Sequence, residues 1–112
     1  MEIEELSTEQ KIKHVQDTLF VMSGKWELPV LIAINAGNIR FKDLQRSVPN
    51  ITTKVLSKEL KDLEINKLVV RTIYNTSPVS IEYRVSPYCK SLKPLVDEMI
   101  KWGYNHRIEI SK

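Results

Sequence analysis

Residues 51–71 read ITTKVLSKELKDLEINKLVVR, and this stretch passes from a helical pattern to a strand pattern almost without a break. Leu56, Leu60 and Leu63 recur at helical spacing and predict the buried seam of a helix. Thr52 is the expected N-cap of this helix, and Asn66 is expected to end it in the left-handed conformation. The opposite face carries hydroxyls and lysines, which suit a polyanionic partner but are equally typical of any solvated helix surface.

The N-terminal third of the chain predicts two helices. Residues 8–22 carry apolar side chains at helical spacing, and Thr8 is the expected N-cap. The next residues, 23–25 (SGK), interrupt this pattern. The following segment, 26–36, is apolar on nearly every side, which is typical of a helix at the centre of a core, and we expect it to begin near Lys25.

The remaining segments complete the order helix, helix, helix, helix, strand, strand, helix. Residues 41–48 predict a short third helix, which must end before Pro49. The segment 68–74 is β-branched and aromatic, and 81–85 alternates apolar and polar residues, so together they predict a hairpin with a polar turn. A last helix is expected over residues 87–105, with frayed residues after it.

Length and composition place the chain among soluble, single-domain proteins. Its 112 residues, 42% hydrophobic and 28% charged, are enough for a core without disulfides. The net charge is −3 over residues 1–39, +4 over residues 40–74 and +2 over residues 75–112. We expect no membrane span and no secretory signal, and therefore a cytoplasmic protein. The basic middle and end suit a polyanionic partner, although charge alone favours a solvated charged surface.

The order of elements favours a mainly helical α+β fold, a winged helix-turn-helix in one domain over residues 1–112. Residues 40–66 would form the helix-turn-helix, whose second helix lies in the DNA major groove, and residues 68–86 would form the wing. Hydroxyls and cations on these elements can contact bases or phosphates, and Arg84 could add a phosphate contact. The candidate DNA-binding residues are Arg40, Thr52, Thr53, Lys54, Ser57, Lys58, Lys61, Arg71, Asn75, Thr76 and Ser77.

The terminal helices, expected over residues 7–22 and 88–105, each carry an apolar stripe. A domain of this size has one core, which the second and fourth helices should largely fill, so part of both stripes would remain exposed as a homodimer interface. The alternative is that both stripes close the core of a monomer. The candidate interface residues are Ile12, Val15, Leu19, Leu92, Leu95, Met99 and Trp102.

Other function classes have little support in the sequence. Cys89 is the only cysteine and is expected to be inert, and His14 and His106 have no companion ligands, so we expect no metal and no cofactor. No phosphate loop or nucleophile elbow indicates an enzyme. A winged-helix module that binds protein remains the alternative, although the lack of apolar anchors around Lys54 favours DNA.

Several blocks of the chain resemble HxlR-type transcriptional regulators, relatives of the MarR group. These are GKWELPVL, RFKDLQRSVPNITTKVLSKELKDLE, LVVRTIY, VSIEYRVSP and SLKPLVDEMIKWG, which span about residues 19 to 103. The resemblance implies a winged-helix protein that binds an inverted-repeat double-stranded DNA operator as a homodimer joined by its first and last helices. Some relatives sense oxidants with an N-terminal cysteine, but the matching stretch HVQDTLF has none. The resemblance identifies neither an effector nor the regulated genes.

Overall fold

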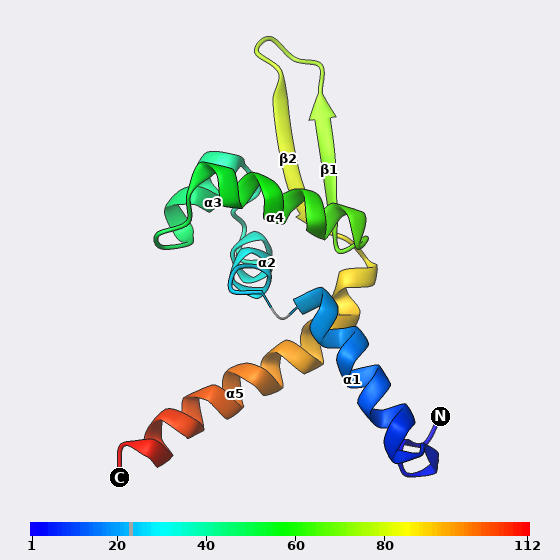
Figure 1. Cartoon of the computed structure of the whole chain (residues 1–112). Coiled ribbons are helices and arrows are strands. Elements are labelled where there is room, and N and C mark those ends of the chain that lie inside the picture. Colours follow the sequence, from blue (N-terminus) through cyan, green and yellow to red (C-terminus); the bar gives the residue numbers. More distant parts are fainter. Residues whose placement is uncertain (23) are drawn as a thin grey trace.

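The computed structural model describes residues 1–22 and 24–112, and its helices and strands follow the predicted order. Figure 1 shows a central group of helices with a hairpin on one side and two diverging terminal helices on the other. In chain order the elements are η1 (Ile3–Glu5), α1 (Thr8–Met22), α2 (Glu27–Asn35), α3 (Phe41–Ser47), α4 (Thr53–Ile65), β1 (Val69–Tyr74), β2 (Ser80–Val85), η2 (Tyr88–Leu92) and α5 (Lys93–Ile110).

The molecule is elongated because α1 and α5 extend away from the rest (Figure 1). Its radius of gyration is 16.6 Å, whereas a compact domain of this length would have about 13 Å. No helix among the described residues is long and apolar enough to cross a membrane. The predicted break at residues 23–25 lies partly outside the described residues, because Ser23 is not among them.

The core lies between α2, α3, α4 and the base of the hairpin. Its fully buried side chains include Val30 of α2, Leu44 of α3 and the α4 seam of Leu56, Leu60 and Leu63. The prediction that α2 and the leucine seam fill most of the core is therefore confirmed. The expectation that this all-round apolar helix lies at the centre of the core is wrong for one face, where Pro29, Ile32 and Asn35 are exposed.

Four helix ends differ from the sequence-based expectation. At α1, Ser7 forms the cap: its Oγ accepts from the Gln10 backbone N–H at 3.1 Å, and the Gln10 Oε1 accepts from the Ser7 N–H at 2.8 Å. Ser7 and Gln10 thus form a capping box, and Thr8 is the first helical residue. The predicted capping role of Thr8 is wrong by one residue.

The end of α4 also lies one residue later than predicted. Asn66 keeps a φ of −80°, and Lys67 takes the left-handed conformation with φ 63°. The Leu68 N–H donates to the Leu63 carbonyl at 2.9 Å and the Lys67 N–H to the Glu64 carbonyl at 3.0 Å, as in a Schellman motif. These bonds satisfy the last carbonyls of α4 and turn the chain directly into β1.

The C-terminal helix begins later and ends later than predicted. Residues Tyr88–Leu92 form a separate 3₁₀ helix, and α5 then runs from Lys93 to Ile110, so the expected helix end near residue 105 is wrong. Pro94 lies in the first turn of α5, where its missing N–H costs no helical hydrogen bond. The proline therefore sets the start of α5.

The hairpin is antiparallel, and its register runs from Val69 opposite Val85 to Tyr74 opposite Ser80. Its β2 strand is joined to the segment before α3, because the Tyr83 N–H donates to the Ile39 carbonyl at 2.7 Å. The wing is thus attached to the helix-turn-helix through the backbone as well as through side chains.

Candidate nucleic-acid interface

The first turn of α4 presents the predicted hydroxyl and lysine face to solvent. Thr52 caps the helix, since its Oγ1 accepts from the Val55 N–H at 3.2 Å, and this prediction is confirmed. The Thr53 Oγ1 accepts from Gln45 Nε2 at 2.8 Å, a contact that joins α4 to α3. The two threonines therefore hold the start of α4 in place, and their remaining hydrogen-bonding capacity is what they could offer a base or phosphate.

Ser57 and three lysines extend this surface along α4, and all four are exposed. Within the described part of the chain, Lys54 and Lys61 form no ion pair. Lys58 differs, because its Nζ lies 2.8 Å from Asp62 Oδ2, one turn further along the same helix. The hydrogen bond that Lys58 donates to Asp62, and the negative charge of Asp62, raise the pKa of the Lys58 ammonium above its ordinary value. Asp62 therefore neutralises part of the charge expected of Lys58.

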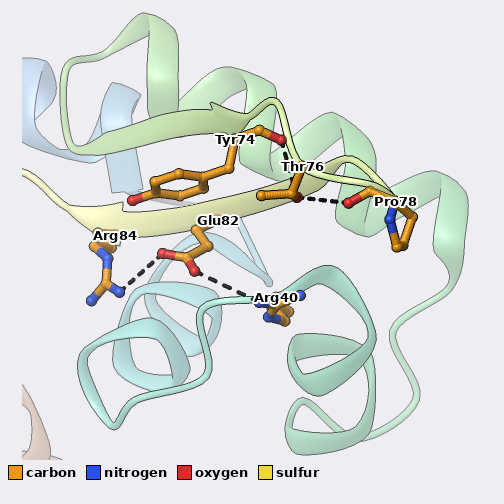
Figure 2. Close-up of polar contacts among 6 residues, drawn as sticks. All are labelled: Arg40, Tyr74, Thr76, Pro78, Glu82 and Arg84. Atoms are coloured by element: carbon orange, nitrogen blue, oxygen red, sulfur yellow. Dashed lines mark hydrogen bonds and ion pairs between the residues drawn. The ribbon is translucent and has the colours of Figure 1, made fainter.

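A cluster of three charged residues lies where the wing meets the helix-turn-helix (Figure 2). Arg84 Nη2 donates to Glu82 Oε1 at 3.0 Å, and Arg40 Nη2 lies 3.8 Å from Glu82 Oε2. Arg40 immediately precedes α3, whereas Glu82 and Arg84 are on β2. Arg40 and Arg84 are predicted DNA contacts, whereas the sequence indicates no role for Glu82.

Arg71 lies apart from this cluster. The ladder places Arg71 opposite Tyr83 and Arg84 opposite Val70. Because successive residues of a strand point to opposite faces, Arg71 and Arg84 project from opposite faces of the hairpin. Arg71 is exposed and forms no ion pair with the described residues. Both arginines were expected to supply phosphate contacts beside the wing tip. They could do so only from opposite faces of the hairpin.

The tip of the wing is exposed and internally hydrogen-bonded. The Thr76 Oγ1 donates to the Pro78 carbonyl at 2.7 Å (Figure 2), and the Thr76 N–H donates to the Tyr74 carbonyl at 2.8 Å. Asn75 and Ser77 are exposed on either side of it. The hydroxyl of Thr76 is therefore used to shape the turn, while its two neighbours remain open to a partner.

The terminal helices expose most of their predicted interface residues. Ile12, Val15 and Leu19 of α1 are each more than half exposed, and Trp102 of α5 is 68% exposed with its ring stacked on His106 at 4.7 Å. Leu95 and Met99 are also exposed and border a hollow where α5 meets α1.

Leu92 differs from the other predicted interface residues. It lies in η2 rather than on α5, and it packs, half-buried, against the core. The expectation that Leu92 belongs to the exposed stripe of the last helix is therefore wrong, because that helix begins one residue after it.

Cys89, His14 and His106 are the remaining candidates for a reactive thiol or for metal ligands. Cys89 is buried, and burial raises the pKa of its thiol above the ordinary value, so the reactive thiolate is disfavoured. The described residues contain no group of three or more His, Cys, Asp or Glu side chains that could hold a metal ion.

Comparisons with known proteins agree on one family. The model of the family described as HxlR-like helix-turn-helix matches residues 21–110. The uncharacterized HTH-type transcriptional regulator YtcD of Bacillus subtilis (strain 168) is 39% identical over 92 residues, which cover 82% of this chain and 73% of YtcD. A crystal structure of ytcD is similar with a TM-score of 0.78 at 39% identity, covering 82% of this chain and 94% of that one. The redox regulator HypR in its reduced form is similar with a TM-score of 0.81 at 32% identity, covering 88% and 97%.

Proposed function

The chain belongs to the HxlR-like helix-turn-helix family, and we propose that it binds an inverted-repeat operator in double-stranded DNA as a homodimer. Membership of this family makes it a transcriptional regulator with a DNA-binding fold rather than an enzyme. The observation that carries the proposal is the uncovered face of α4, on which hydroxyls and lysines follow a capped first turn. In a helix-turn-helix the N-terminal residues of the second helix contact base edges in the major groove.

The lysines of α4 are proposed to contribute unequally to DNA binding. Lys54 stands in the first turn without an ion pair to any described residue, so it is the proposed contact to a guanine edge or an adjacent phosphate. Ser57, one turn further on, can donate to a base or a phosphate. Lys58 gains less from a contact with DNA, because its ammonium must give up or weaken its ion pair with Asp62 to reach a base or a phosphate. We therefore assign Lys54 the larger energetic role.

The wing and the segment before α3 supply the proposed backbone contacts. The side chains of Arg40 and Arg84 are more than half exposed, and both form an ion pair with the carboxylate of Glu82. The tip residues Asn75 and Ser77 are polar and uncharged, which suits contacts that orient the protein without selecting a base. These groups would hold α4 in register on the duplex.

The proposed dimer rests on the exposed apolar residues of α1 and α5. Apolar side chains of both helices, among them Phe20 and Trp102, are exposed to an extent that is unusual for a monomeric soluble protein. A two-fold axis between such helices would hold two copies of α4 about one DNA turn, roughly 34 Å, apart. That spacing is the reason for proposing an inverted repeat.

The test is selection of duplexes bound by the full chain from a random library, followed by binding titrations over a salt series. We expect two inverted half-sites about ten base pairs apart, centre to centre. Affinity should fall steeply with salt, because lysines and arginines displace counterions from phosphates. A library that yields no enriched motif, with binding insensitive to salt, would refute the proposal and favour a protein-binding module.

A further inference from the structure

Glu82 is the acidic member of a basic surface, and its side chain is only 15% exposed. We propose that Glu82 is a positioning residue of the DNA-binding surface, which holds Arg40 and Arg84 side by side so that both contact the same stretch of DNA backbone. The inference rests on the proposed function and adds to it a residue that makes no contact with DNA itself.

The geometry leaves both guanidinium groups available to a second anion. Arg84 makes a single hydrogen bond to Glu82, through Nη2 at 3.0 Å, and Arg40 Nη2 forms a looser ion pair with it at 3.8 Å, so neither pair is a two-nitrogen fork of hydrogen bonds. A guanidinium carries five N–H donors, so most of each group remains free for phosphate oxygens. The arginine side chains are 56% and 59% exposed, which places these free donors in solvent.

The position of Glu82 in the fold lets it link two parts of the surface. Arg40 belongs to the helix-turn-helix and Arg84 to the wing, and the carboxylate lies between them (Figure 2). The neighbouring hydrogen bond from the Tyr83 N–H to the Ile39 carbonyl, at 2.7 Å, keeps the two backbones together. The strand that carries Glu82 is therefore fixed beside Arg40, and a guanidinium that the carboxylate orients loses less freedom when it meets a phosphate.

A different role for Glu82 makes an opposite prediction. If the carboxylate only reduces the positive charge of the surface, its removal should strengthen binding to any DNA, because one repulsive charge is lost. If it positions the two arginines, its removal should weaken binding to the operator even though the net charge becomes more positive. The sign of the change in operator affinity thus separates the two roles.

The experiment compares Glu82→Gln with Glu64→Gln in the full chain. Glu64 is exposed on α4 and forms no ion pair with the described residues, so its variant changes the net charge equally without touching the arginines. Affinity for the selected operator and for an unrelated duplex of the same length is measured by fluorescence anisotropy over a salt series. Thermal unfolding of each variant is recorded alongside.

For Glu82→Gln we expect operator affinity to fall about tenfold, the effect of roughly one lost charge-assisted contact. Affinity for the unrelated duplex should stay level or rise, and the salt slope of the operator complex should become shallower by about one. Glu82→Asp, which keeps the charge on a shorter stem, should recover part of the loss. Glu64→Gln should leave the ratio of operator to unrelated affinity unchanged.

Two results would overturn the inference. One is a parallel rise in both affinities for Glu82→Gln and Glu64→Gln, which would make Glu82 a simple negative charge. The other is an equal loss for both duplexes together with a lower unfolding temperature, which would make its role structural. If the parent chain itself shows no preference for any duplex, the proposed function fails as well, and that result is visible before any variant is made.

Discussion

Replacement of Glu59 by Gln should stabilise the fold at neutral pH. Glu59 lies on the buried side of α4 and is 8% exposed, and among the described residues its Oε2 has no hydrogen-bond partner. The Oε2 of Glu27, the first residue of α2, is buried and unpartnered in the same way. Burial raises the pKa of the Glu59 carboxyl above its ordinary value, and the negative charge of Glu27 raises it further. The ionised form is therefore disfavoured in the folded protein.

The sign of the pH dependence follows from proton binding. Between the ordinary pKa of 4.5 and the raised native pKa, the folded state holds a proton that the unfolded state has released. The free energy of unfolding therefore falls as pH rises through this window, and it stays at the lower value above it. Glutamine carries no charge and no such pH dependence. The difference between variant and parent should be largest at pH 7 and should vanish toward pH 4.5.

The magnitude comes from the unpaired buried atom. A buried polar group without a partner costs about 1–3 kcal/mol, and the amide of glutamine can donate a hydrogen bond where the carboxylate cannot. We expect a gain of about 1 kcal/mol at pH 7, which corresponds to roughly 4 °C in the unfolding temperature of a domain of this size. Urea unfolding followed by circular dichroism at several pH values measures it, with Glu64→Gln as the control of equal charge. A variant that is less stable than the parent at pH 7, or that keeps the same pH dependence, would refute this reasoning.

Three further predictions concern DNA binding and assembly. Lys54→Ala should weaken operator binding by roughly 1–3 kcal/mol if Lys54 contacts a base. Lys58→Ala should weaken operator binding less, because Asp62 already neutralises part of the Lys58 charge. An unchanged operator affinity in the folded double variant would contradict this assignment. Replacing residues 75–77 with glycine should lower affinity for many sequences alike, and a changed base preference without lost affinity in a selection experiment would count against this role. Trp102→Ala should shift the protein toward monomer in sedimentation and weaken operator binding, and a parent chain that sediments as a monomer at micromolar concentration would show the proposed dimer to be wrong.

The central part of the fold was predictable because its periodicity is strong. The leucine spacing of α4 and the alternation of β2 each depend only on residues close in sequence, and both elements were placed within about a residue of their bounds. Motifs in the same stretches led to the family, and the match over residues 21–110 confirms that resemblance. Periodicity identifies an element because burial repeats with it.

Helix ends were less predictable because they depend on single hydrogen bonds. Ser7 and Thr8 are both good caps, and only the reciprocal bond to Gln10 decides between them. At the other end of α4, Asn66 is the better left-handed residue by type, yet Lys67 takes that conformation. The bonds of Lys67 and Leu68 to the last carbonyls of α4 accompany that choice, and sequence alone does not show which residue will be placed to make them.

The site was predictable in composition but not in its ion pairs. The contact between Lys58 and Asp62 joins residues four apart on one helix, so its spacing already contained the signal. The contact between Arg40 and Glu82 joins residues far apart in sequence and depends on how β2 lies against the segment before α3. The alternation of β2 places Glu82 and Arg84 on one face, but no local pattern shows that Arg40 lies against them.

The exposure of α1 in the structure is stronger evidence for a partner than the apolar stripe in its sequence. Every side chain from Thr8 to Phe20 is exposed, and Met22, in the last turn, is the only residue of this helix that is buried. An isolated helix of 15 residues is only marginally stable in water, because most helical stability in proteins comes from packing of an apolar face. The capping box at Ser7 adds only about 1 kcal/mol. In the proposed dimer the missing packing is supplied by a second copy, so folding of α1 and association of the two chains would depend on the same apolar surface.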